Sequence, residues 1–515
     1  MMTPASILTV WALIYGEDAN LPAIVAIGPF AVCFVLYWWL VQRGRVSPKE
    51  SQMSKPAESQ PSESQSPGAN ATPDREEDIS PQPPLRPIDR EEEGQLRDCF
   101  PWSVYYLRNL EYRPQVVVCR GQLRTNPDRA YKTIQSNIAQ KFGDRFLVVF
   151  QEGLYAKQPF FILVPNPQAE SKKPESSETT TRPLFALGLL LVTLFTTTLA
   201  GVAFSEGFSR WQDLYAAALI SAENAKQVYE ATPAIEVRQL WQGLSDPTRL
   251  WQGLSYSLPL LAVIGIHEFG HYFAARFHQI RATLPYFVPF PFFLGTVGAF
   301  TQMRSPIPNR KALFDVSVAG PLVGLLLSIP LLMWGLVHSE LVPLSALDVL
   351  KNEGLLDAER GLLNFNALTP QFSLLLAVAS KLALGSELNA DVVVNLNPMA
   401  IAGYLGLLLA AFNLLPVGQL DGGHMVHAMF GQRTALGIAQ VTRLLMLVLA
   451  LAYGDRRELL FGAIVLFLMP IRDEPALNDV SELDNRRDFI GLTALALLTA
   501  IVLPAPKMLG PLLGF

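Results

Sequence analysis

Two histidines and a glutamate stand close together in residues 265–272, which read GIHEFGHY. On a helix, His267 and His271 lie one turn apart on nearly the same face, so both imidazoles can reach one cation. Glu268 sits beside the open coordination position, where it can take a proton from water that the metal activates and pass it to a leaving amine. This spacing predicts a metal-dependent hydrolase in which Glu268 is the catalytic base.

The surroundings of this run strengthen the prediction. Between Arg249 and Arg276, Glu268 is the only acidic or basic residue besides histidine, so the run lies in an apolar helix long enough to cross a membrane. A lone carboxylate there costs roughly 2.5–3.5 kcal/mol on insertion scales. The alternative, a structural pair of hydrogen-bonded histidines, leaves three costly groups at metal-ligand spacing unexplained.

A zinc hydrolase usually supplies three protein ligands and leaves one position for water. His278 is too far along the helix from His271, by roughly 10 Å of rise, and is expected at the membrane interface. Asp421 is the better third ligand because it ends the uncharged run 392–420 at the depth expected for the two histidines. One Zn²⁺ ion per chain is therefore expected, held by side chains from two separate helices.

Around Asp421 the chain reads NLLPVGQLDGGH. Pro416 lacks a backbone donor and should break the helix, while Gly422 allows close backbone approach. Asn413 is expected to hold substrate or an active-site backbone group. His424 is expected either to orient Asp421 or to face the lipid headgroups, and both readings stay open. The other two histidines are expected to be structural: His338 and His427.

Half of the 515 residues are hydrophobic and 17% are charged, and the charged residues are unevenly spread. This pattern predicts a polytopic α-helical membrane protein of about 6–8 spans plus a re-entrant loop or β-hairpin, with a small cytoplasmic α+β domain. The net charge of −5 and the lack of a strongly basic stretch argue against a nucleic-acid partner. The three cysteines are too few for a disulfide framework or a four-thiolate metal site.

Uncharged apolar runs of sufficient length mark the expected spans. They cover residues 19–42, 184–204, 253–275, 316–337, 392–420 and 489–506. Residues 434–453 and 459–471 are expected to form a hairpin. Residues 361–380, which asparagine and proline interrupt, are expected to be re-entrant or to lie on the membrane surface.

Composition divides the chain into six expected parts. They are a membrane anchor (1–46), a disordered Ser/Pro/Glu linker (47–94), a small soluble α+β domain (95–165), a second linker (166–182), a membrane catalytic core (183–472) and a C-terminal segment with the last span (473–515). The anchor is expected to be retained because no basic residue precedes Arg43. Basic residues after the first span predict that the soluble domain is cytoplasmic.

Short β-branched and aromatic runs mark strands in the soluble domain. They cover residues 115–119, 146–150 and 160–164. Asn126 followed by Pro127 predicts a helix start, because asparagine caps helices and proline suits the first helical position. This domain is expected either to bind a regulator or to serve as a packing platform.

Residues 284–302 carry three prolines and many aromatic side chains, and they end in TVGAFTQ. We expect a membrane-embedded loop and an edge strand that includes Gly298. A transmembrane substrate helix hides its scissile bond because its amides are hydrogen-bonded, so this strand is expected to pair with an unwound substrate. A packing loop that closes the helical bundle is the alternative.

The joint pattern of HEFGH with Asn413, Pro416 and Asp421-Gly422 resembles the site-2 protease family of intramembrane zinc metalloproteases. The likeness covers roughly residues 184–470, and it includes GTVGAF from residue 295 and the FD and AGP residues that follow residue 313. The run RGQLRTNPD from residue 120 is similar to the GNLR region of the EGY-like branch of plastids and cyanobacteria, with Gln122 in place of asparagine.

This resemblance implies that His267, His271 and Asp421 bind zinc and that Glu268 is the catalytic base. It implies cleavage of membrane protein substrates within or near their transmembrane segments, as in regulated intramembrane proteolysis. It also implies a bacterial, cyanobacterial-type plasma or thylakoid membrane. The expected partners are therefore membrane protein substrates and the lipid bilayer.

Two other classes of protein stay open. A CAAX-type membrane protease uses a glutamate as its third ligand, which the Asn-Pro-Asp-Gly pattern does not fit. A catalytically silent scaffold or a metal-binding transporter has no need of Glu268, and substitution of this residue by glutamine separates such a protein from a protease.

Overall fold

The computed structural model describes residues 88–503 and residue 509, apart from several gaps. The gaps are residue 114, 154–157, 167–181, 232–246, 291–293, 356–372, 390 and 453–456. The chain divides into two units, Met1–Gln82 and Pro83–Phe515, and only the second contains described residues. The expected anchor, most of both expected linkers and the first part of the expected segment 361–380 therefore lie outside the described residues.

The module that the sequence predicts to be soluble is a four-stranded antiparallel sheet with two helices. Its strands are β1 (Tyr105–Arg113), β2 (Val116–Leu123), β3 (Phe146–Glu152) and β4 (Pro159–Pro165), in the order β1-β2-β4-β3. Helix α4 (Pro127–Phe142) begins as the Asn-Pro signal predicts, because the Asn126 side chain accepts a hydrogen bond from the Asp128 N–H. The three predicted strands are present as well.

Helix α3 (Arg90–Asp98) precedes the sheet and overlaps the end of the expected linker 47–94. Ile88 and Leu96 are buried in the same core as the ring stack of Phe150 on Phe161. These two aliphatic side chains explain why the folded module includes residues before 95: each removes apolar surface from water in an otherwise polar stretch.

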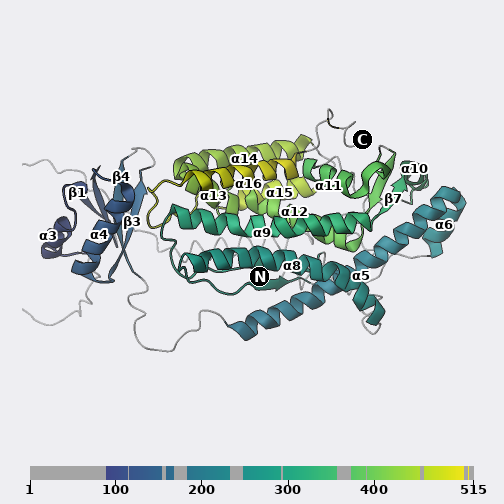
Figure 1. Cartoon of the computed structure of the whole chain (residues 1–515), viewed down its shortest axis with the longest axis horizontal. Coiled ribbons are helices and arrows are strands. Elements are labelled where there is room, and N and C mark those ends of the chain that lie inside the picture. Colours follow the sequence, from purple (N-terminus) through teal and green to yellow (C-terminus); the bar gives the residue numbers. More distant parts are fainter. Residues whose placement is uncertain are drawn as a thin grey trace, which may run out of the picture. The chain divides into compact units, whose positions relative to one another are not determined.

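Helices dominate the rest of the chain (Figure 1). They are α5 (Pro183–Ile220), α6 (Ala222–Ala231), α8 (Pro247–Phe277), α9 (Arg310–Val337), α10 (Leu344–Asn352), α11 (Leu374–Leu384), α12 (Pro398–Leu414), α13 (Asp421–Phe430), α14 (Gln432–Ala452), α15 (Arg457–Leu468) and α16 (Asn485–Val502). Two small two-stranded antiparallel sheets accompany them. They are the hairpin of β5 (Tyr286–Pro289) with β6 (Thr296–Phe300), and the pair of β7 (Glu340–Pro343) with β8 (Val392–Asn395), whose strands lie far apart in the sequence.

Four helices of the described part are long and apolar enough to cross a membrane: Pro183–Ile220, Pro247–Phe277, Arg310–Val337 and Gln432–Leu451. The prediction of an unbroken span over residues 392–420 is wrong. This run begins as strand β8 and continues as the shorter helix α12, because Asn397 caps a new helix that starts at Pro398. Within the expected re-entrant segment, α11 begins at Leu374 with Ser373 as its cap.

Helix α9 is the centre of the helical part, with α8 on one side and α12 on the other (Figure 1). Glycines let α9 and α12 approach closely: a β-carbon at Gly403 would lie 2.5 Å from the Leu332 nitrogen, and one at Gly335 would lie 2.2 Å from the Ala400 nitrogen. Small residues at such contacts are typical of helices packed within a membrane.

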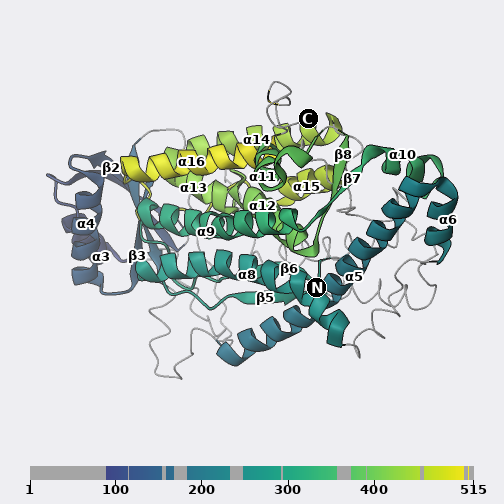
Figure 2. The ribbon, with the colours of Figure 1, turned by 45° about the vertical axis from the view of Figure 1, so that its right-hand side comes forward.

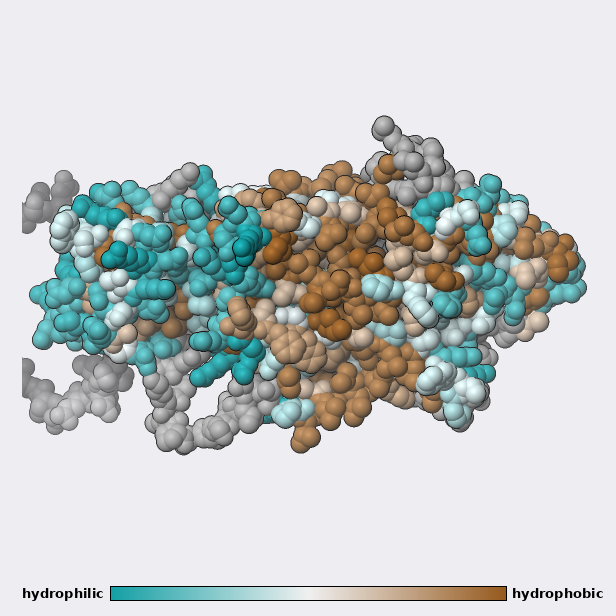
Figure 3. Space-filling model, in the orientation of Figure 1, coloured by the Kyte–Doolittle hydropathy of each residue, from teal (hydrophilic) through white to brown (hydrophobic). Residues whose placement is uncertain are grey.

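Apolar and polar surface are separated along the molecule. Hydrophobic side chains gather in a continuous band over the helical region, and hydrophilic residues lie on either side of it (Figure 3). At one end, α6 and α10 lie beside the end of α5, next to strands β7 and β8 (Figure 2). Tyr215, Val342 and Leu350 form part of the small buried core of this end region. This distribution is the one expected when a bilayer surrounds the central helices.

Candidate metal centre

Helix α8 brings two imidazoles to the carboxylate at the first position of α13. The Nε2 atoms of His267 and His271 are 3.2 Å apart, and they lie 3.6 and 3.3 Å from Asp421 Oδ2. A tetrahedral zinc site with bonds of about 2.0–2.1 Å separates its ligand atoms by about 3.3–3.4 Å. The three side chains therefore fit the donor set and the spacing of one tetrahedral metal ion.

The orientation of His271 is fixed by the neighbouring helix. Its Nδ1–H donates a hydrogen bond to the main-chain oxygen of Val316 on α9, at 2.8 Å. Nε2 then carries the lone pair and faces the other ligands, which is the usual arrangement for a metal-binding histidine. Asn413, at the end of α12, places its Nδ2 atom 3.1 Å from His267 Nε2. The asparagine therefore lies at the candidate metal centre and contacts a candidate ligand, while its predicted hold on substrate or on an active-site backbone group stays a prediction.

Glycines on α9 make room for the imidazoles. A β-carbon at Gly320 would lie 2.2 Å from His271 Nε2, a distance that no real side chain tolerates. One at Gly324 would lie 3.2 Å from His267 Nδ1, a tight contact. The close approach of α9 to α8 thus depends on these two positions, and it is what brings the Val316 carbonyl within reach of His271.

A sharp turn between α12 and α13 places the carboxylate. Helix α12 ends at Leu414, two residues before Pro416, and α13 begins at Asp421. A β-carbon at Gly422 would lie 1.9 Å from the Leu414 oxygen, so only glycine permits the chain to fold back this closely. The helix break predicted at Pro416 and the close approach predicted at Gly422 are both present.

Glu268 lies next to the ligands and beside strand β6. It is 9% exposed, and its main-chain oxygen accepts a hydrogen bond from Thr301 Oγ1 at 3.4 Å. Strand β6 pairs only with β5 among the described strands, and its Val297 side chain is 71% exposed. Gly298 has a φ of +127°, and no atom lies within 4 Å of the position of a β-carbon there. An open strand edge therefore runs close to the carboxylate.

Two family models match parts of this chain. Residues 255–452 match the model described as Peptidase family M50, and residues 94–171 match the model described as EGY3 middle domain. These matches support the resemblance of this chain to the site-2 protease family, in its EGY-like branch. The region that matches Peptidase family M50 contains every ligand candidate, and the EGY3 middle domain match covers most of the module with strands β1 to β4.

Several curated relatives of this chain are named as probable zinc metalloproteases of chloroplasts. EGY1 of Oryza sativa subsp. japonica is 35% identical over 245 residues, which are 48% of this chain and 39% of the relative. EGY1 of Arabidopsis thaliana is 34% identical over 263 residues, 50% of this chain and 45% of the relative. EGY2 of Oryza sativa subsp. indica is 26% identical over 414 residues, 80% and 66% of the two chains.

The aligned part of this chain spans less than half the length of the two EGY1 relatives. No solved structure matches the chain.

Two other histidines have carboxylate partners away from the metal centre. His278 Nε2 lies 2.8 Å from Asp315 Oδ2, so this histidine stands outside the ligand cluster, as expected. His424 Nδ1 lies 2.6 Å from Asp473 Oδ1. The sequence does not predict this contact, and both expectations for His424 stay predictions.

His427, expected to be structural, is fully buried between two carboxylates. Its Nδ1 lies 2.6 Å from Asp473 Oδ2, and its Nε2 lies 3.1 Å from Asp479 Oδ2. Burial alone would lower the pKa of His427, but the hydrogen bonds and charges of the two aspartates outweigh it and raise the pKa to about 9. The imidazolium form of His427 is therefore the stable one at neutral pH.

Sequence reasoning missed the residues that support the ligands. Val316 acts through its main-chain oxygen, which no side-chain pattern reports. Gly320 stands out in the sequence only as part of an AGP motif, and Asp473 belongs to no motif. The only sequence signal for Asp473 is its place in an acidic, proline-containing stretch between two apolar helices, which is equally typical of an exposed loop.

Proposed function

We propose that this chain is an intramembrane zinc metalloprotease that hydrolyses peptide bonds within or near transmembrane segments of membrane proteins. The proposal rests on one observation. Three candidate ligand atoms lie at tetrahedral spacing beside Glu268, and Glu268 belongs to helix α8, which is apolar enough to cross a membrane. The two EGY1 relatives are named as probable zinc metalloproteases, which supports the same chemistry.

In this proposal His267, His271 and Asp421 hold one Zn²⁺ ion. When bound, zinc would supply Lewis acidity, which activates water near neutral pH and polarises the scissile carbonyl. Glu268 takes a proton from the attacking water and delivers it to the leaving amine. The Asn413 amide, next to His267, is available to donate a hydrogen bond to substrate.

The open edge of β6 supports a role in presenting the substrate. A transmembrane helix must unwind before water can reach its scissile bond, because its amides are satisfied within the helix. We infer that the unwound segment pairs with β6 and extends the β5–β6 sheet by one strand. The exposed Val297 and the open space at Gly298 are compatible with such an approach.

The proposed setting is the thylakoid or plasma membrane of a cyanobacterial-type cell. The chloroplastic names of the relatives support a membrane of this kind. The basic residues after α8 and at the start of α9 support a cytoplasmic position for these ends and for the soluble module. They are Arg281, Arg304, Arg310 and Lys311. In the same scheme the module, proposed as residues 95–165, recruits substrate or a regulator, and 183–472 form the catalytic core.

Glu268→Gln tests the proposal against the alternative of a silent scaffold or a metal transporter. We expect the purified variant to keep a full equivalent of zinc by mass spectrometry of the metal and to lose hydrolysis of a transmembrane peptide in detergent by a factor of about 10² or more. Glu223→Gln on α6 is the matched control and should behave as the unaltered chain. If the Glu268→Gln variant still hydrolyses the peptide, the proposal that this chain is a protease with Glu268 as its catalytic base is rejected.

A further inference from the structure

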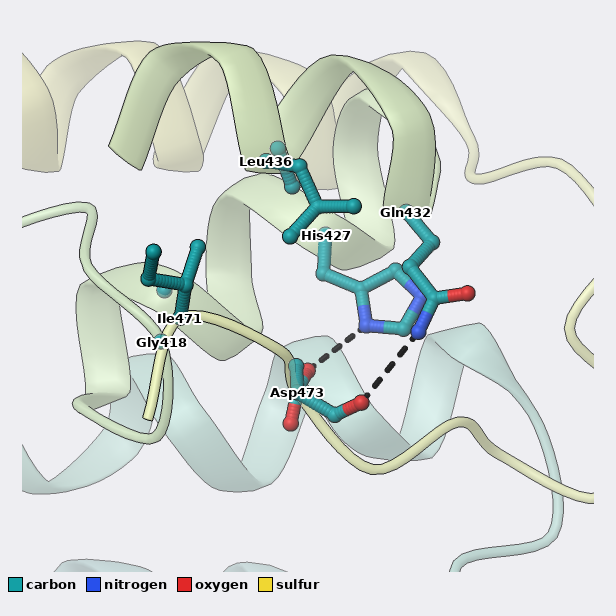
Figure 4. Close-up of a pocket in the computed structure, with 8 residues that line it drawn as sticks. Gly418, His427, Gln432, Leu436, Ile471 and Asp473 are labelled. Carbon is teal, nitrogen blue, oxygen red and sulfur yellow. Dashed lines mark hydrogen bonds and ion pairs between the residues drawn. The ribbon is translucent and has the colours of Figure 1, made fainter. Parts of the chain in front are cut away.

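Asp473 lies in the α15–α16 connection, residues 469–484, after the end of the Peptidase family M50 match at residue 452. It is 8% exposed, and its two carboxylate oxygens each lie 2.6 Å from an imidazole Nδ1, one of His424 and one of His427. Its main-chain oxygen accepts a hydrogen bond from Gln432 Nε2 at 3.3 Å. Figure 4 shows His427 and Gln432 turned toward Asp473.

Asp479 continues this network to a second helix. It is 3% exposed, and it accepts hydrogen bonds from His427 Nε2 and from Arg310 Nε, each at 3.1 Å. Arg310 is the first residue of α9, the helix that supplies the Val316 carbonyl to His271. One buried ionic network therefore joins the helix that carries the third ligand to the helix that orients the second.

The same connection packs against the turn that precedes the third ligand. A β-carbon at Gly418, whose φ is +54°, would lie 1.9 Å from the Pro470 oxygen. Gly423 packs just as closely on the other side of the turn, since a β-carbon there would lie 2.3 Å from the Gly418 oxygen. The position of α13 is thus set by contacts on both its first turn and its later histidines.

We propose that Asp473 is a positioning residue for the third metal ligand. This positioning role rests on the proposed function and deepens it, because Asp421 is the ligand that Asp473 would position. Helix α13 has ten residues, and His424 lies one turn after Asp421 on it. A rigid shift of so short a helix moves the ligand carboxylate with it, and metal sites tolerate ligand-distance changes of only about 0.2 Å.

The test uses the full chain in detergent with Co²⁺ in place of zinc, because the visible spectrum of bound cobalt reports ligand geometry without any substrate. We expect Asp473→Asn to change the cobalt spectrum and to weaken metal affinity by about tenfold or more, as outer-shell substitutions do. His427→Gln should change both readings in the same direction. Asp484→Asn is the matched control, because Asp484 lies in the same connection but bonds Arg487 of α16.

Two results would overturn the inference. One is an Asp473→Asn variant that binds cobalt with unaltered affinity and spectrum, even if its thermal unfolding midpoint falls, since the residue would then only stabilise the fold. The other is a spectral change of equal size in Asp484→Asn. The proposed function can fail separately. If His267→Ala abolishes cobalt binding but the unaltered chain hydrolyses no peptide, the proposed protease activity is rejected, and the cobalt spectra of Asp473→Asn still decide whether Asp473 positions the metal ligand.

Discussion

The Nδ1 atom of His271 donates its proton to the main-chain oxygen of Val316, 2.8 Å away on the neighbouring helix. The acceptor is part of the backbone of α9, so no change of the Val316 side chain removes it. The hydrogen bond persists only while α8 and α9 keep their separation and their relative position along the helix axes. Helix α9 thus acts as an outer support of the candidate metal centre, although it supplies no ligand to it.

Gly320→Ala should damage the metal centre through this support. The new β-carbon would fall 2.2 Å from His271 Nε2, so either the imidazole or α9 must move. We expect metal affinity to fall at least tenfold, measured by competition with a fluorescent zinc chelator. Gly437→Ala on α14 is the control, because no atom lies within 4 Å of its β-carbon position and alanine favours a helix by about 1 kcal/mol. Equal affinities in the two variants would contradict the prediction.

Asp421→Ala should remove the contribution of metal binding to the stability of the folded chain. A ligand present at about 100 times its Kd stabilises the folded state by about 2.7 kcal/mol, and removal of the metal forfeits this. Addition of a chelator should therefore lower the thermal unfolding midpoint of the unaltered chain but leave that of Asp421→Ala unchanged. Asp391→Ala, at the start of β8, should respond to the chelator as the unaltered chain does. A chelator-sensitive midpoint in Asp421→Ala would remove this residue from the ligand set.

Val297→Pro should abolish cleavage while zinc content stays intact. Proline removes a main-chain donor from β6 and blocks pairing with an added strand. Val297→Ala keeps the donor and changes only an exposed side chain, so its kcat/KM should stay within about threefold of the original. Both variants are compared on one transmembrane peptide, with metal analysis on the same samples. Normal cleavage by Val297→Pro would discard the strand-pairing model.

His427→Gln should alter the pH dependence of stability. The folded pKa of His427 is raised to about 9, above the value of about 6.5 expected when unfolded. Its contribution, on the order of 3 kcal/mol at most, is therefore complete below pH ~6.5 and is lost as pH rises through about 9. The unfolding midpoint of the unaltered chain should fall across this window, and His427→Gln should flatten the fall.

His338→Gln is the control for this experiment, because the His338 ring bonds the Trp334 main-chain oxygen at the far end of α9. It should retain the full decline between pH 6.5 and 9. A decline of the same steepness in His427→Gln would show that the network with Asp473 and Asp479 does not govern it.

The ligand cluster could be predicted because its signal is local. His267 and His271 are one helical turn apart, and Asp421 follows a helix break that Pro416 announces. The supports could not be predicted in this way. The partners of Asp473 lie more than forty residues earlier in the chain, and an aspartate near a proline between two helices is typical of an ordinary loop.

The error over residues 392–420 has a different cause. Absence of charge predicts one span, although Asn397-Pro398 repeats the helix-start signal that correctly predicts α4 at Asn126-Pro127. Lack of charge reports an apolar environment, whereas capping residues report where a helix begins. For α12 the second signal was the more informative.

The α15–α16 connection also fixes the order in which the contacts around the candidate metal centre can form. Its main chain hydrogen-bonds Phe150 of β3 and Ile307 ahead of α9, Asn478 bonds Asp128 across 350 positions, and Asp479 reaches Arg310 across 169. During translation these earlier segments leave the ribosome before the connection does. The contacts that join α13, α9 and β3 through residues 469–484 can therefore form only after all six histidines of the sequence have been synthesised.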